Sequence, residues 1–265
     1  MKRIMFLLMV VMSSVSGAQS EADKISTAQI IERANLASFY AGEDGRSDAR
    51  MIIVDNKDNK QMRQFVILRK DLEEGGNQHF LVVFSRPSDV KDTVFLVHKK
   101  VDTDDDRWLY LPALDLEKRI SASDNRTSFV GSDFYYEDVS GRNPSLDKHE
   151  LLRQDDEYYY LKSTPKQADS VEFAYYTMKI DKLSFLPMLI EYFNTSDAAI
   201  RRVEVIEVSD VQGHPTVMKS KVSNLKTGGY TLMEFRRPAY DLGMDETVFT
   251  IRSLRNPPKS WLSGQ

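Results

Sequence analysis

Two aromatic-rich segments carry the residue types best suited to binding. Trp108–Pro112 alternates, so that Trp108 and Tyr110 would share one face of an extended strand. Gly131–Asp138 places three consecutive aromatic residues between acidic ones, outside any clear strand pattern. Aromatic side chains outside regular structure usually cover a core. The alternative is a lid or docking loop over an apolar cavity.

Other candidates for chemistry fail on spacing. A calcium loop that began at Asp102 would need Gly and Glu where the chain has Arg107 and Ala113. The acidic run therefore indicates a hairpin turn. The histidines lack the i, i+4 pair of a helical zinc site, and the chain has neither a Gly-x-Ser-x-Gly elbow nor a phosphate-binding glycine loop. We therefore predict no catalytic residue, no cofactor, no metal and no enzymatic activity.

The first residues have the features of a secretory signal peptide. Lys2 and Arg3 precede an apolar stretch from 4 to 12, and small residues end at Ala18. We expect cleavage after Ala18, export to the periplasm and no lipid anchor, because the chain has no cysteine. The net charge of −4 argues against nucleic acid and against a polybasic membrane patch.

The elements that must position the aromatic segments are mainly strands. A helix is expected over Thr27–Tyr40, with Ser26 or Thr27 as its N-cap. About ten strands separated by turn-prone clusters predict an antiparallel meander, which is too many for a flat open sheet and therefore strongly curled. Besides 108–112, the expected strands are 51–54, 64–68, 80–84, 94–101, 158–163, 171–180, 189–194, 201–209, 216–225 and 230–235.

Two of these strands, Phe80–Phe84 and Val94–Val97, are apolar on both faces. One face of an antiparallel sheet is normally solvated, so either a helix covers the second face or that face lines an apolar cavity. The residues predicted to line a lipid-binding cavity are Phe80, Val82, Phe84, Phe95, Val97, Trp108 and Tyr110. Those predicted for a lid or a partner-binding loop are Gly131, Ser132, Asp133, Phe134, Tyr136, Glu137 and Asp138.

No linker rich in Pro, Gly or Ser divides the chain. We expect a signal peptide over residues 1–18, one domain over 19–255 and a C-terminal tail over 256–265. The tail contains Pro257, Pro258 and Trp261, and we expect it to be a poorly ordered end.

The order of several short motifs resembles the LolA-like outer-membrane lipoprotein-sorting family. Trp108–Pro112, Arg119–Ser121 and Gly131–Asp138 carry the resemblance, and further matches lie at 85–97, 186–192, 224–228 and 249–255. The resemblance extends from about residue 25 to residue 255. It implies a mainly β (α+β) fold: a curved, incompletely closed antiparallel β-barrel with helices packed in its mouth and an apolar cavity between them.

The resemblance also implies a function. It suggests a periplasmic carrier or chaperone for lipid or lipoprotein cargo, acting in transfer towards the outer membrane. Members of this branch often accompany exporters of the MMPL type in the resistance–nodulation–division (RND) class, so such an inner-membrane transporter is an expected partner. The family offers no catalytic residues to transfer. The alternative is a periplasmic regulatory or adaptor module that binds a protein through the aromatic-acidic loop.

Overall fold

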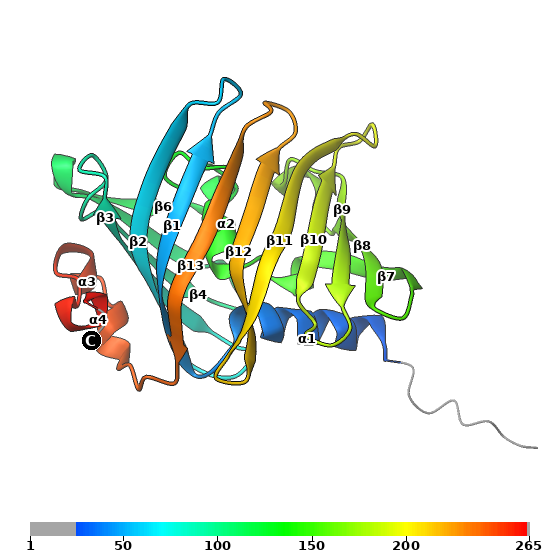
Figure 1. The fold of residues 1–265 in the computed structure, drawn as a ribbon, viewed down its shortest axis with the longest axis horizontal. Coiled ribbons are helices and arrows are strands. Elements are labelled where there is room, and N and C mark those ends of the chain that lie inside the picture. Colours follow the sequence, from blue (N-terminus) through cyan, green and yellow to red (C-terminus); the bar gives the residue numbers. More distant parts are fainter. Residues whose placement is uncertain (1–24, 264–265) are drawn as a thin grey trace, which may run out of the picture.

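One curved antiparallel sheet dominates the molecule. The computed structural model describes residues 25–263, so the expected signal peptide lies outside the described residues. Thirteen strands follow one another in the order β6-β5-β4-β3-β2-β1-β13-β12-β11-β10-β9-β8-β7. The edge strands β6 and β7 do not pair with each other, so the sheet curls without closing (Figure 1). The predicted mainly β, incompletely closed architecture is confirmed.

The strands are more numerous than the sequence indicates, and most of them are longer, although β4 and β9 are shorter than expected. They are β1 (Asp44–Val54), β2 (Lys60–Asp71), β3 (Gln78–Arg86), β4 (Val94–Lys99), β5 (Asp106–Leu111), β6 (Leu116–Ile120), β7 (Asp147–Gln154), β8 (Tyr158–Pro165), β9 (Tyr175–Asp181), β10 (Pro187–Phe193), β11 (Ala199–Val211), β12 (His214–Asn224) and β13 (Tyr230–Tyr240). The helices are α1 (Thr27–Phe39), α2 (Tyr136–Ser140), α3 (Arg252–Arg255) and α4 (Lys259–Leu262). Short 3-10 turns are η1 (Pro112–Leu114), η2 (Ala122–Asp124), η3 (Pro144–Leu146), η4 (Ala168–Ser170) and η5 (Glu246–Phe249).

The strands that sequence patterning missed are the two edges. β6 is Leu-Glu-Lys-Arg-Ile and only Ile120 is buried, and β7 is similarly rich in charge. Charged side chains are common on edge strands because they discourage pairing with other chains, and they also remove the apolar alternation that reveals a strand. The expected strand over 171–180 was wrong in its first part, because the strand begins only at Tyr175.

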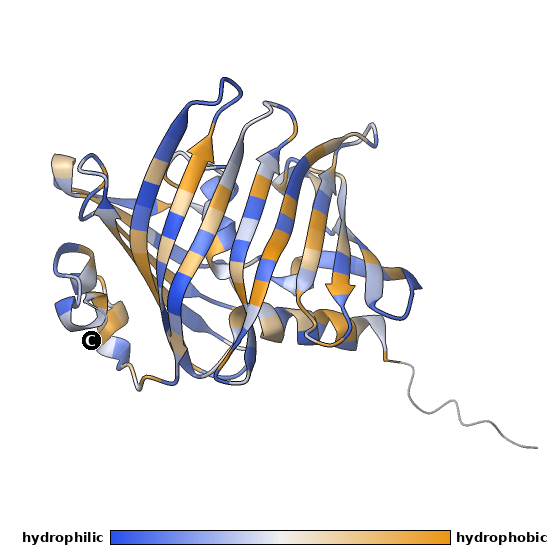
Figure 2. Cartoon of the chain, viewed as in Figure 1, coloured by the Kyte–Doolittle hydropathy of each residue, from blue (hydrophilic) through white to orange (hydrophobic). Residues whose placement is uncertain are grey.

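Helix α1 covers the concave face of one half of the sheet. Ser26 caps it through a capping box with Gln29, which confirms the expected N-terminus. Ile30, Ile31 and Ala34 are buried against a core built from β8 to β11. Figure 1 shows this helix lying along one end of the sheet, inside its curve. Polar and apolar residues alternate along β10 to β13 (Figure 2), as expected for strands with one covered face and one solvated face.

The C-terminal segment, Met244–Leu262, covers the convex face of β2 to β5. Met244, Val248, Phe249 and Leu254 are buried there, and Trp261 packs beside them. The Arg46 guanidinium donates to the carbonyl oxygens of Trp261 and Leu262, at 2.8 and 3.1 Å. The expectation of a poorly ordered tail after residue 255 was therefore wrong, because apolar contacts and a buried arginine hold α4 on the sheet.

Candidate functional site

A continuous apolar surface lies on the concave face of β3 and β4. Five of the predicted cavity residues form it and we call them the apolar wall: Phe80, Val82, Phe84, Phe95 and Val97. Every second residue of a strand points to one face, and the antiparallel register sets Val82 opposite Phe95 and Phe80 opposite Val97. Neighbouring strands extend the wall with Ala49, Met51, Phe65, Leu109 and Met233.

The predicted loop lies directly on this wall. We call residues Phe129–Ser140 the covering segment, which contains α2. The Phe129 ring lies 5.7 Å from the ring of Phe84 and 5.3 Å from that of Phe95, and Tyr136 lies 5.1 Å from Phe95, all between ring centroids. Wall residues are consequently 0–3% exposed. The concave surface predicted as a cavity is filled by the chain's own aromatic residues.

The residues predicted for the lid are mostly inside the fold. Ser132, Tyr136 and Glu137 are buried, Gly131 is exposed, and the remaining three, Asp133, Phe134 and Asp138, are partly buried. The interpretation that these aromatics cover a core is therefore confirmed. In this conformation they do not form an exposed loop that could present its aromatic side chains to a protein partner.

Trp108 and Tyr110 do not share the concave face with the other predicted cavity residues, and placing all seven on one surface was wrong. Both side chains belong to the convex core with the C-terminal segment. The register sets Trp108 opposite Leu96, whose side chain faces away from the wall. A strand alternates its side chains, so Leu109, rather than Trp108 or Tyr110, reaches the wall. The two-sided apolar strands therefore have one face under the covering segment and the other under the C-terminal helices.

Contacts with distant parts of the chain hold the covering segment near its start and just beyond its end. Near its start, the Thr231 hydroxyl on β13 accepts from the Asp133 amide at 3.0 Å and donates to the Asp133 carboxylate at 2.8 Å. Beyond its other end, Gly141 has a φ of +78° and an added Cβ would lie 2.5 Å from the Phe39 ring of α1. Only glycine fits such a close approach in this backbone conformation.

Three arginines, which we call the anchoring arginines, fix α2: Arg126, Arg142 and Arg201. Arg201 on β11 forms an ion pair with Asp138. Arg126 and Arg142 both pair with Glu137, Arg142 at 3.2 Å. Residue spacing gave no signal for these partners, because Arg201 is more than sixty positions away from Asp138 in the chain. Only the packing of α2 against the folded sheet brings Arg201 and Asp138 together.

The anchoring arginines are buried among aromatic rings and further acids. The Arg126 guanidinium carbon lies 4.8 Å from the Phe173 ring centroid and 5.3 Å from that of Tyr192, close enough for cation–π contact. Its two hydrogen bonds to Glu172 are each 2.7 Å long. Burial alone would raise the pKa of Glu172, but the bonds and charge of Arg126 outweigh it and lower that pKa. The Arg126–Glu172 pair is thus charged at neutral pH.

Asp133 is held more weakly. Its burial raises the pKa of the carboxyl, although the Thr231 hydrogen bond and the nearby Arg201 charge oppose the shift. Arg201 donates to the Asp133 backbone carbonyl at 3.4 Å, but within residues 25–263 the Asp133 carboxylate forms no ion pair like those of Glu137 and Asp138. At Asp133 the covering segment therefore lacks the ion pairs that hold α2.

The acidic run Asp102–Asp106 lies at the turn between β4 and β5, as predicted, and Asp106 is the first residue of β5. Asp105 in this turn pairs with Arg107 at 2.7 Å and accepts from Ser140 at 3.2 Å, so it contacts the end of the covering segment. Among the described residues no cluster of three or more His, Cys, Asp or Glu side chains could hold a metal ion.

The fold and the covered wall define a class: open, curved β-sheets with helices on their concave face, as in LolA-like proteins. A LolA superfamily protein from Nitrosomonas europaea has a TM-score of 0.67 at 17% identity over 86% of this chain and 99% of its own. An outer membrane lipoprotein-sorting protein domain from Vibrio parahaemolyticus has a TM-score of 0.78 at 23% identity over 86% and 97%.

A more specific relationship follows from two further matches. A family model described as "Uncharacterized protein" matches residues 76–256. A DUF1329 family protein from Desulfovibrio piger has a TM-score of 0.78 and 26% identity over 86% of this chain and 98% of its own. The chain belongs to the DUF1329 family. No curated protein matches it.

The length and apolar character of the helices bear on whether one of them could cross a membrane. Within residues 25–263, no helix combines the length and the apolar character that crossing a membrane would require.

Proposed function

We propose that this protein is a periplasmic carrier that binds the acyl chain of a lipid or of lipid-modified cargo against the apolar wall. The observation that carries the proposal is the wall itself: a large apolar surface covered by a separate segment rather than by a paired strand or a long helix. The likeness of the fold to a lipoprotein-sorting domain and a LolA superfamily protein supports the carrier proposal.

Cargo entry in this proposal requires displacement of the covering segment. Phe129 and Tyr136 occupy the surface that an acyl chain would take, so the covering segment and the cargo compete for the wall. Burying apolar cargo surface contributes about 25 cal/mol per Å², which offsets the aromatic contacts that are lost. The Asp133–Thr231 hydrogen bonds oppose release of the segment, and the anchoring arginines hold its far end.

Entry into the periplasm by a cleaved signal peptide, and transfer of cargo from an MMPL-type exporter towards the outer membrane, belong to this proposal too. The pattern of residues 1–18 motivates the first, and the resemblance to the LolA-like family motivates the second. Edman sequencing of the exported protein tests the cleavage after Ala18, and affinity capture from cells with and without the exporter tests the partnership.

Substitution of Thr231 by Val tests displacement of the covering segment. This variant keeps the side-chain volume but removes two hydrogen bonds to Asp133, each contributing about 1 kcal/mol. A less stable closed state should raise the apparent affinity for a fluorescent acyl probe by about 5- to 30-fold. Native mass spectrometry of the loaded protein should show the added mass of the probe.

Thr216→Val is the matched control. Its hydroxyl on β12 hydrogen-bonds with the Tyr240 hydroxyl at 2.9 Å, away from the covering segment. This variant should leave probe affinity unchanged. A wild-type protein that takes up no lipid or probe would contradict the carrier proposal, whereas uptake with equal affinity in Thr231→Val would contradict displacement of the segment.

A further inference from the structure

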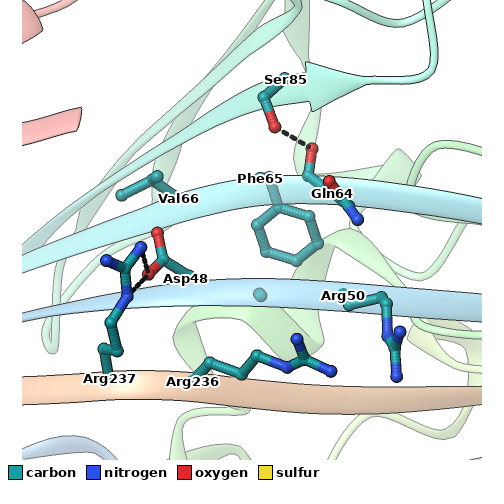
Figure 3. A pocket seen from close by; sticks show the side chains of 9 residues that line it. Asp48, Arg50, Gln64, Phe65, Val66, Ser85, Arg236 and Arg237 are labelled. Carbon is teal, nitrogen blue, oxygen red and sulfur yellow. Dashed lines mark hydrogen bonds and ion pairs between the residues drawn. The ribbon is translucent and has the colours of Figure 1, made fainter. Parts of the chain in front are cut away.

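A polar groove lies on the convex face, on the other side of the sheet from the apolar wall. It crosses β13, β1, β2 and β3 and has a volume of about 470 Å³, within the usual range of about 300–1,000 Å³ for small-molecule sites. Figure 3 shows its polar side chains rising from these strands. Its lining combines the apolar residues Ala49, Phe65 and Val66 with polar ones, which are Asp48, Arg50, Gln64, Ser85, Arg236 and Arg237.

Positive charge exceeds negative charge around this groove. Asp48 pairs with Arg46 at 2.9 Å and with Arg237 at 2.6 Å. Glu234 pairs with Arg50, with Lys219 at 3.2 Å and with Arg236 at 3.9 Å. Five basic side chains thus share these two carboxylates, and the charged groups that line the groove itself are three arginines and one acid.

Two donors in the groove still lack hydrogen-bond partners within residues 25–263. The Arg236 side chain is 63% exposed, and its closest approach to Glu234, 3.9 Å, is too long for a hydrogen bond. The side-chain amide of Gln64 is likewise unbonded, since Ser85 donates to the Gln64 backbone carbonyl instead (Figure 3). An arginine fork beside a free amide suits the oxygens of a phosphate group.

We propose that this groove binds the phosphate of an anionic phospholipid headgroup, so that the protein docks on a membrane surface by its convex face. The cations come from β1, β12 and β13, and Arg50 and Arg236 are more than 180 positions apart in the chain. The net charge of −4, which argued against a basic membrane patch, averages over the molecule and hides this local excess. The proposal does not depend on lipid carriage, because none of the charged groups of the groove belongs to the apolar wall.

Vesicle co-sedimentation tests this docking surface. The full protein is mixed at low salt with phosphatidylcholine vesicles that either contain or lack phosphatidylglycerol. We expect binding only to the anionic vesicles, with loss at high salt because charges at the surface are screened. Arg236→Gln should weaken that binding about fivefold, since one basic residue near an anionic surface contributes about 1 kcal/mol.

Arg202→Gln is the matched control, because Arg202 is also a convex-face arginine paired with an acid, Glu191, but lies on β11 outside the groove. It should bind vesicles as the wild type does, and both variants should keep the wild-type thermal unfolding midpoint and acyl-probe uptake. Equal binding to the two vesicle types, or equal loss in both variants, would overturn the proposal. So would calorimetric binding of inorganic phosphate that depends on Arg236 without any vesicle binding, because the site would then take a free anion.

Discussion

At the scale of single residues, Glu137 is the point at which the ionic contacts of the covering segment meet. Its side chain is 3% exposed and pairs with both Arg126 and Arg142. Each arginine has a second acid, Glu172 for Arg126 and Asp147 for Arg142, so the charges alternate through a network. A buried ion pair contributes little by itself, but removing one partner leaves the other charges buried and uncompensated.

Glu137→Gln should lower the free energy of unfolding by about 3 kcal/mol, because the amide keeps the volume but removes the central negative charge. Urea denaturation monitored by circular dichroism measures the change. Glu150→Gln, at an exposed position of β7, serves as the comparison and should change stability by less than about 0.5 kcal/mol. Equal stability of the two variants would show that the network around Glu137 adds nothing.

At the scale of elements, two histidines join the sheet to the C-terminal segment. The rings of His79 on β3 and His98 on β4 are 4.1 Å apart, and His98 Nε2 donates to the Phe249 carbonyl oxygen at 2.7 Å. The register sets Lys70 beside His79 and Asp106 beside His98. Burial and then the neighbouring His98 lower the pKa of His79 to about 4. The fold thus holds His79 in its neutral form.

Acidification should therefore weaken the fold through His79. Its pKa in the folded protein lies below its ordinary value of 6.5, so its stabilising contribution is present above pH 6.5 and lost as the pH falls towards 4. Wild-type protein should lose about 1 to 2 kcal/mol relative to His79→Gln across that window, a figure reduced for partial solvent screening. Urea denaturation at each pH measures it. A His214→Gln variant should follow the wild type, and a parallel decline in His79→Gln would rule out this cause.

At the scale of the whole molecule, one strand pairing joins the two halves of the chain. β1 pairs with β2, its neighbour in sequence, and also with β13, which ends at residue 240. The covering segment bridges the same halves, because it packs on β3 and β4 and is bonded to β11 and β13. Neither half has an independent edge at this junction, so we predict that the expected single domain unfolds as one unit.

Denaturation with two probes tests this cooperativity. The two tryptophans, Trp108 and Trp261, both belong to the convex core, whereas far-ultraviolet circular dichroism reports the entire sheet. The unfolding midpoints measured by tryptophan fluorescence and by circular dichroism in guanidinium chloride should coincide. A fluorescence transition at lower denaturant concentration would instead mean that the C-terminal segment detaches before the sheet unfolds.

The sequence alone determined the elements whose own residues show a pattern. Ser26 and the apolar spacing after it predicted α1, and the alternation of apolar residues predicted most strands, because both signals arise from neighbours in the chain. Phe80–Phe84 and Val94–Val97 are apolar on both faces, which predicted two strands whose second face is covered or lines a cavity. The motif order around Trp108–Pro112 and Gly131–Asp138 indicated the LolA-like architecture.

Tertiary structure alone decided what covers each face. The charged edges β6 and β7, the placement of Trp108 on the convex side, and α4 at the C-terminus depend on contacts that no local pattern encodes. The aromatic residues of Gly131–Asp138 were visible from the start, but their position on the apolar wall depends on Arg201 and Thr231, which strand pairing brings from distant parts of the chain. Strand order and register create such contacts. The covering of the apolar wall and the polar groove on the convex face therefore exist only in the folded molecule.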